Sequence, residues 1–243
     1  MNMRRGVNVA ALVAGLAIGG VASADILLTS FEDPGVFPGV QYVDLGDPLV
    51  DHPLANNPGE PFVNWAMTGT EIGFSSAYFN TRNDVGLTDG DFVGVTDFTG
   101  TVGSYTNGSQ GFQMQDADGA MEMTTDSFAI DAVFSTLAVD IYIRETGWEA
   151  EDLVKVTVFA DNTELTLLDT TGSDIDDLGI EGSWMTLTID LSAYTNAAAV
   201  FRLDSNSSSE ELYIDNIRLV PSPASFALLG LGLAGAGLRR RRA

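Results

Sequence analysis

The stretch LAVDIYIR at residues 137–144 decides the fold of this chain. Its apolar side chains Val139, Ile141 and Ile143 alternate with more polar ones that begin at Asp140. Successive side chains of a strand point to opposite faces of a sheet, so this alternation predicts a β-strand. We expect one face of the strand to lie in the core and the other in water.

Short runs of the same kind recur along the chain, separated by clusters of Gly, Asn, Asp and Ser, and we find no long helical period. Strands are expected at residues 26–31, 73–79, 92–96, 111–115, 120–125, 137–144, 154–160, 164–168, 184–191, 199–203 and 212–219. Strands at this spacing are typical of two packed sheets. We therefore predict an all-β fold, a single β-sandwich or jelly roll, over residues 25–220.

Residues 43–62 interrupt the strand pattern. They contain four of the eight prolines and the only histidine, His52. Proline lacks a backbone donor and breaks strands, so we expect a long loop folded over the sandwich. Farther along, Asp161-Asn162 separates two apolar runs and predicts a hairpin turn.

The N-terminal residues are typical of a secretory signal peptide. Arg4 and Arg5 precede an apolar run at residues 7–21, which ends in a small-residue cleavage pattern from Ala22 to Ala24. The run is shorter than the roughly 18 to 20 residues of a membrane-spanning helix. We expect a signal helix over residues 1–24, export through a translocon, and cleavage by signal peptidase after Ala24.

The region between the two chain ends is strongly acidic. It holds five basic residues against 34 acidic ones, a formal charge of −29. This charge argues against nucleic acid and anionic lipid headgroups as partners. Solubility in a salty medium and cation binding are two interpretations that composition leaves open. The chain has no cysteine, which excludes disulfides, thiolate metal sites and cysteine nucleophiles.

The C-terminal segment, residues 221–243, joins a proline-containing break to an apolar run and a basic block. The three parts comprise Pro221, Ser222 and Pro223, the apolar residues 226–238, and Arg239, Arg240, Arg241 and Arg242. This order resembles the PEP-CTERM sorting signal of Gram-negative bacteria, although Ser222 stands where that pattern has Glu. A helix over residues 224–238 would be about 22 Å long, shorter than a hydrocarbon core of about 30 Å.

The PEP-CTERM resemblance implies a membrane transpeptidase, an exosortase, as a partner and an association with exopolysaccharide. It also implies that the short hydrophobic helix anchors the protein in the membrane before processing. A plain membrane anchor at the tail is the alternative. We therefore expect the protein at the cell envelope or extracellular surface.

A second resemblance is carried by SFEDP at residues 30–34, LTDGDFVGV at 87–95, GFQMQDADG at 111–119 and YIDNI at 213–217. These motifs are similar to an accessory β-domain of secreted proteins from aquatic bacteria, and in outline to carbohydrate-binding jelly rolls. The resemblance implies that the first and last strands lie together. It also implies a structural calcium ion between Glu32 and Asp215.

Closely spaced carboxylates offer further calcium ligands, because Ca²⁺ takes six to eight oxygen atoms. Three groups qualify: Asp84 with Asp89 and Asp91; Asp116 with Asp118 and Glu122; and Asp174 with Asp176 and Asp177. Each group is either a metal site or a solvated turn in which Asp bonds the local backbone.

Exposed aromatic rings are the usual platform for sugar binding on a β-sandwich. We consider Trp148 a partly exposed loop residue, and Trp65 and Tyr78 to lie near the long loop and its cleft. Trp184 opens an alternating strand and is assigned to the core. A Ser/His/Asp site would need His52, but no G-x-S-x-G motif accompanies it, so His52 is interpreted as structural.

The sequence as a whole predicts an exported, surface-retained, non-catalytic binding or matrix protein, associated with polysaccharide and stabilised by calcium. The alternative is a secreted hydrolase of glycosidase type, which needs only two suitably spaced carboxylates.

Overall fold

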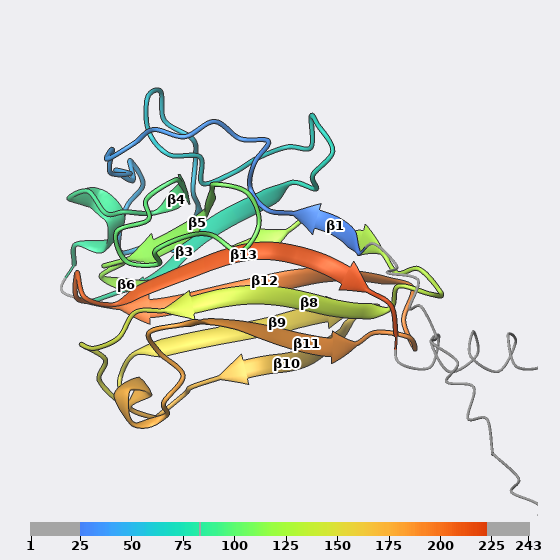
Figure 1. The fold of residues 1–243 in the computed structure, drawn as a ribbon. Coiled ribbons are helices and arrows are strands. Elements are labelled where there is room, and N and C mark those ends of the chain that lie inside the picture. Colours follow the sequence, from blue (N-terminus) through green and yellow to red (C-terminus); the bar gives the residue numbers. More distant parts are fainter. Residues whose placement is uncertain (1–24, 83, 223–243) are drawn as a thin grey trace, which may run out of the picture.

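Two antiparallel sheets pack face to face in the computed structural model, which describes residues 25–82 and 84–222 (Figure 1). Sheet 1 has the strand order β11-β8-β13-β5-β4, with β1 also paired to β13. Its strands are β1 (Ile26–Thr29), β4 (Gly94–Thr96), β5 (Gly111–Gln115), β8 (Thr136–Ile143), β11 (Trp184–Asp190) and β13 (Glu211–Val220).

Sheet 2 has the order β10-β9-β12-β6-β3-β2, with β7 also paired to β12. Its strands are β2 (His52–Pro53), β3 (Phe74–Thr81), β6 (Gly119–Thr125), β7 (Phe128–Ala129), β9 (Leu153–Ala160), β10 (Thr163–Asp169) and β12 (Asn196–Ser205). Two short 3₁₀ turns, η1 (Gly86–Thr88) and η2 (Ile175–Asp177), lie in the connections.

The core between the sheets is built from the inward side chains of alternating strands. At one part of it Phe31, Phe74 and Phe112 pack edge to face or tilted, with ring centroids 5.4–5.8 Å apart. All three rings are buried. The removal of this apolar area from water is the main contribution to the stability of the fold. No disulfide adds to it, because the chain has no cysteine.

The all-β prediction is confirmed, and each of the expected strand segments overlaps an observed strand. The Asp161-Asn162 turn is also confirmed: both residues have positive φ, 44° and 70°, as a two-residue hairpin turn requires. The first and last strands pair as the jelly-roll resemblance implies, with Ile26 opposite Leu219. The two-residue strands β2 and β7 were not predicted, because each is too short for a period to show.

The expectation that one face of residues 137–144 lies in water is wrong. Asp140 and Tyr142 are buried, although they point away from the sandwich core. A loop over residues 97–110 covers this outer face of sheet 1, and its Tyr105 packs with Tyr142, Tyr213 and Trp184 in a second apolar cluster. Asp140 accepts hydrogen bonds from side chains around it, including Thr106 and Thr186.

The long loop at residues 43–62 is largely irregular, as expected, but His52–Pro53 adds a short strand beside β3. The imidazole of His52 contacts Asp44 at 2.6 Å and the Val50 carbonyl at 2.5 Å, so both ring nitrogens are engaged. Burial alone lowers the pKa of His52, but these two contacts outweigh it and the pKa is raised. These contacts support the structural interpretation of His52.

Both predicted terminal helices, with Ala22, Ala24, Pro223 and the arginine block at 239–242, lie outside the described residues. Of the C-terminal segment, Pro221 and Ser222 are described, and the Ser222 amide donates to the Val133 carbonyl at 3.0 Å. Within residues 25–82 and 84–222, no helix has the length and apolar character needed to cross a membrane.

We predict that Phe112→Ala lowers the free energy of unfolding by about 3–5 kcal/mol, because it leaves a cavity among three packed rings. Urea denaturation measures this loss. Phe159→Ala is the matched control, since this residue is 46% exposed on β9 and lies outside the core, and it is expected to cost much less, about 0.5 kcal/mol. Equal losses in both variants would contradict the assigned core.

Candidate metal centre and ligand groove

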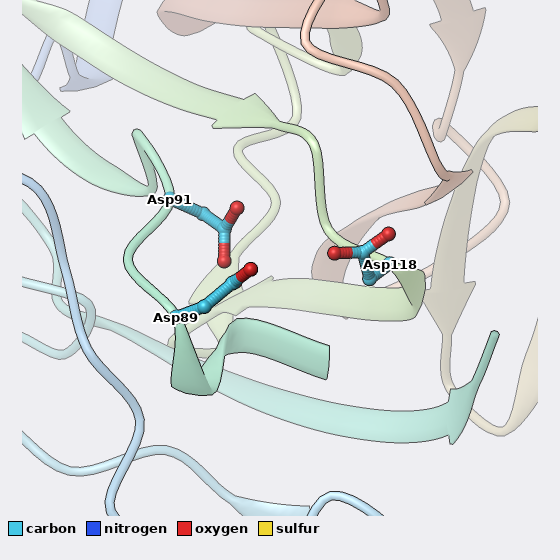
Figure 2. Close-up of side chains that lie close together, drawn as sticks. All are labelled: Asp89, Asp91 and Asp118. Atoms are coloured by element: carbon cyan, nitrogen blue, oxygen red, sulfur yellow. The ribbon is translucent and has the colours of Figure 1, made fainter. Parts of the chain in front are cut away.

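Three carboxylates from two distant segments meet at one end of the sandwich. Asp89 and Asp91 lie between η1 and β4, and Asp118 lies in the turn between β5 and β6. One oxygen from each lies within 4.8 Å of the others, and the three side chains point toward a common space (Figure 2). We call these three residues the metal centre.

Backbone contacts fix both segments of the metal centre. Asp91 exchanges two hydrogen bonds with Tyr42, at 2.8 and 3.0 Å. The Asp118 carbonyl accepts from the Arg82 amide at 2.6 Å and from the Tyr78 hydroxyl at 2.9 Å. Gly119 follows with φ +147°, and a Cβ there would lie 2.0 Å from a backbone oxygen of β3, so only glycine permits this approach.

The metal centre holds more negative charge than its surroundings compensate. Asp91 is 4% exposed, and its Oδ2 atom has no hydrogen-bond partner within the described structure. Burial, with the charges of Asp89, Asp116 and Asp118, raises the pKa of Asp91 to about 8. Burial and the nearby Asp116 raise the pKa of Asp118 to about 6. A bound cation would relieve this repulsion and satisfy the unpartnered oxygen.

Calcium fits this donor set better than a softer metal. Ca²⁺ prefers oxygen ligands at 2.3–2.6 Å in flexible geometry, and three carboxylates offer up to six oxygens, to which water can add. The described structure offers no sulfur or imidazole ligand here. The residues present therefore fit a calcium ion.

The metal centre contains residues from two carboxylate groups that were predicted from the sequence as separate sites. Asp89 and Asp91 came from one predicted group and Asp118 from another. Asp84 lies outside the cluster, and Asp116 acts on it only through its charge. Glu122 points from β6 toward the positive charge of Arg202. The two predicted groupings are thus corrected to one, because the β5–β6 turn approaches the segment before β4.

The third predicted group is a local turn. Asp174 precedes η2 and its carboxylate accepts from the Asp176 amide at 3.1 Å. This contact is the helix-capping bond typical of Asp in a solvated turn. Within the described residues, Asp174, Asp176 and Asp177 form no cluster of metal-ligand geometry.

Glu32 and Asp215 each hold the loop that covers sheet 1. Glu32 accepts from the amides of Ser109 and Gln110, both at 2.7 Å. Asp215 is fully buried and accepts from the amides of residues 106 and 107, at 2.7 and 2.8 Å. Burial raises the pKa of Asp215 to about 6, although these bonds oppose the rise. The calcium ion implied between Glu32 and Asp215 stays a prediction.

The aromatic residues expected to contact sugar are mostly inaccessible. Trp148 is only 2% exposed and its indole nitrogen donates to the Arg144 carbonyl at 2.9 Å, so the expectation of a partly exposed loop position is wrong. Tyr78 is fully buried beneath the metal centre. Trp65 is half-buried against Phe62, with ring centroids 5.2 Å apart. Trp184 is half-buried and belongs to the outer cluster rather than the central core.

A groove of about 360 Å³ lies on the outer face of sheet 1, beside the covering loop. Phe92 and Phe98, which flank β4, contribute rings that are 38% and 49% exposed. Its polar lining includes Gln115, Arg144 and Glu211. The sequence analysis missed this groove because it considered Trp and Tyr but not Phe. The two Phe residues beside a short expected strand are the signal that could have indicated it.

The polar lining of the groove is held in place by hydrogen bonds. Arg144 forms an ion pair with the buried Glu211 carboxylate. Glu211 also accepts from Thr101 at 2.9 Å and from the Tyr213 hydroxyl at 2.6 Å. Gln115 donates to the Ser208 carbonyl at 2.9 Å. The groove thus combines fixed polar groups with exposed aromatic faces.

No protein-family model matches the sequence, and neither does any curated protein. Among solved structures, the carbohydrate-binding module TmCBM61 in complex with β-1,4-galactotriose matches with a TM-score of 0.39 and 12% identity, over 54% of this chain and 83% of that one. A CBM51 module from Clostridium perfringens in complex with methyl-galactose matches at 0.30 and 12%, over 54% and 82%.

The adhesin domain of Lys-gingipain from Porphyromonas gingivalis matches at a TM-score of 0.31 and 14% identity, over 48% of this chain and 76% of that one. These matches are distant likenesses of one β-sandwich to others. We transfer no ligand or activity from them.

We predict that calcium raises the melting temperature of the chain by about 5–10 °C over chelator, because an ion present at 100 times its Kd adds about 2.7 kcal/mol. Asp91→Asn is expected to lose most of this shift. Asp84→Asn is the control, since it removes an exposed carboxylate outside the metal centre. If calcium raised the melting temperature of Asp91→Asn as much as that of the wild type, the assignment of the metal centre would be contradicted.

We also predict that the metal-free protein gains stability as the pH falls from about 8 to about 5. A carboxyl whose folded pKa is raised stabilises the fold fully below its unfolded pKa and loses that contribution as pH rises through the folded value. Asp91 and Asp118, with pKa values of about 8 and about 6, both act this way, and His52 acts in the same direction. Carboxyls with lowered pKa values, such as Asp161, are ionised throughout this window.

Melting curves in chelator across that pH range measure the trend. With calcium the slope is expected to reverse, because protons compete with the ion for the same oxygens. The slope in chelator should be shallower in Asp91→Asn. A metal-free melting temperature that falls on acidification to about pH 5 would contradict the raised pKa values.

Proposed function

We propose that this chain is an exported, non-catalytic protein that binds a neutral saccharide in the groove of sheet 1 and is stabilised by calcium at the metal centre. The observation that carries the saccharide proposal is the pair of exposed rings, Phe92 and Phe98, beside the fixed polar side chains of Arg144 and Gln115.

The composition of the groove supports a sugar ligand. Aromatic faces pack on the C–H face of a pyranose ring, while hydroxyl groups need directional donors and acceptors. Phe92 and Phe98 offer the faces, and Arg144, Gln115 and Thr101 offer polar groups. A volume of about 360 Å³ lies within the range of about 300–1,000 Å³ that is usual for small-ligand sites.

Electrostatics favour a neutral saccharide over an acidic one. The charge of Arg144 is compensated by Glu211, so the groove presents no unpaired cation. The formal charge of −29 over residues 25–220 repels a polyanion. Recognition would then depend on stacking and hydrogen bonds, which salt screens weakly.

The lining of the groove supports binding rather than hydrolysis. A glycosidase uses two carboxylates about 5–10 Å apart, one of which acts as an acid. Glu211 is the one carboxylate among the groove residues, and it is engaged by Arg144, Thr101 and Tyr213. The carboxylates with clearly raised pKa values, which include Asp91, Asp118, Glu210 and Asp215, do not line the groove.

The cellular part of the proposal is drawn from the sequence. The predicted signal peptide and the segment that resembles a PEP-CTERM signal support the proposal of export, retention at the cell surface and recognition by an exosortase. A groove for saccharide would suit a protein held close to extracellular polysaccharide. The formal charge argues against nucleic acid as a partner.

A glycan array on the full chain in calcium, followed by calorimetry with the best neutral glycan, tests the groove. We expect Phe98→Ala and Phe92→Ala each to weaken affinity about tenfold or more, since loss of a ring contact worth about 1.4 kcal/mol changes Kd tenfold. Phe159→Ala removes an exposed ring on the other sheet and should leave affinity unchanged. Unaltered binding in both groove variants, or hydrolysis of the glycan, would contradict the proposal.

A further inference from the structure

A second group of carboxylates lies at the same end of the sandwich as the metal centre. Glu149 and Asp152 come from the connection between β8 and β9, and Glu210 comes from the turn between β12 and β13. One oxygen from each lies within 4.8 Å of the others. The strand register explains why these two connections lie close together, because Asp204 near the end of β12 pairs with Leu153 at the start of β9.

Glu210 is the member of this group that has a buried carboxylate oxygen without a hydrogen-bond partner. Its side chain is fully buried. Oε2 accepts from the amides of Asn206 and Ser207, at 2.6 and 3.0 Å, which fixes the carboxylate in its turn. Oε1 is buried and has no hydrogen-bond partner within the described structure. Leaving a buried charged oxygen unpaired is costly, so this geometry indicates a missing partner.

Arg82 does not supply that partner. Its guanidinium binds Asp152 at 2.6 Å, Asp204 at 3.0 Å and the Glu151 carbonyl at 2.6 Å. Neither Glu149 nor Glu210 forms an ion pair in the described part of the chain. Burial, with the charge of Asp152, raises the pKa of Glu210 to about 7, although its two amide bonds oppose the rise. The negative charge is therefore only partly compensated.

We propose that Glu149, Asp152 and Glu210 form a second site for a divalent cation, with calcium as the ion that fits an all-oxygen donor set. Glu149 is exposed and provides the open side through which an ion and its waters enter. Glu210 provides a buried carboxylate whose Oε1 has no hydrogen-bond partner, and Asp152 provides the remaining lone pairs of a carboxylate already oriented by Arg82 and by the Glu149 amide. This group could not be predicted from the sequence, because its carboxylates come from two connections about 60 residues apart.

The two cation sites share Arg82. Its amide donates to the Asp118 carbonyl in the metal centre, and its guanidinium binds Asp152 in the second site. A cation bound at one site would therefore change the position and charge balance of the residue that supports the other.

Calorimetric titration of the chelator-treated full chain with calcium tests the second site. We expect these two sites to bind two ions in the wild type, one in Glu210→Gln, one in Asp91→Asn and none in the double variant. An ion between Glu32 and Asp215 would add one to every count. Glu210→Gln keeps one oxygen to accept from residues 206 and 207, and replaces Oε1 by an uncharged NH₂ group that cannot bind a cation. Glu151→Gln is the matched control, because it makes the same change at an exposed neighbour outside the cluster, and it should bind two ions.

Terbium luminescence excited through tryptophan gives a second readout, since Trp148 precedes Glu149 directly. The signal should be lost in Glu210→Gln and retained in Asp91→Asn. In chelator, Glu210→Gln should melt no lower than the wild type, because it relieves a buried charge, and a folded variant that still binds two ions would overturn the second site. If Asp91→Asn alone abolishes all calcium binding, the second site is contradicted and the metal centre is supported. If Glu210→Gln alone abolishes all calcium binding, the metal centre is contradicted and the second site is supported.

Discussion

Carboxylates that accept backbone N–H groups hold the long connections of this sandwich in place. Glu71 accepts from the amides of Ser30 and Asp33, and Asp215 accepts from those of residues 106 and 107. A carboxylate bound by two amides is a charge-assisted anchor, about twice as strong as a neutral pair. In a chain without cysteine, these contacts hold the loops in place where disulfides do so in many other proteins. Part of the acidic composition is thus structural, an interpretation that composition alone did not suggest.

Two buried carboxylates differ from these anchors in one respect. Asp91 and Glu210 are each buried with one oxygen that accepts no hydrogen bond within the described structure. In both cases two other carboxylates lie close by, and the cluster that they form could hold a cation. An anchoring carboxylate and a candidate ion ligand in this protein therefore differ in whether a hydrogen-bond donor contacts the second carboxylate oxygen.

The strands could be predicted from the sequence because their signal is local. Alternation with a period of two located every long strand, and Asp161-Asn162 located a turn, since both patterns depend on neighbouring residues. The environment of each strand could not be predicted in the same way. Tyr142 is buried because a loop about 40 residues earlier in the chain lies over it, and that loop has no period that reveals its position.

The candidate site shows the same limit. The acidic residues were recognised, but their grouping depended on the approach of the β5–β6 turn to the segment before β4, which spacing in the sequence does not contain. Trp148 was placed at the surface because charged residues surround it in the chain, whereas its ring turns inward beneath them. The groove lined by Phe92 and Phe98 could not be predicted, because its shape depends on where the covering loop lies on sheet 1.

The antiparallel pairing of β1 with β13 gives the molecule a polarity. Ile26 lies opposite Leu219, so the described chain starts and ends at one pole, while the turn that precedes β13 and carries Glu210 lies at the other. Ten residues of β13 separate the poles by about 33 Å at 3.3 Å per residue. If the chain is tethered after residue 222, the attachment point lies at the pole opposite the turn that carries Glu210, and the distance between them exceeds the roughly 10 Å screening length of charges at moderate salt. Cation binding at that turn would then depend on the ion content of the surrounding solution and not on charges at the attachment point.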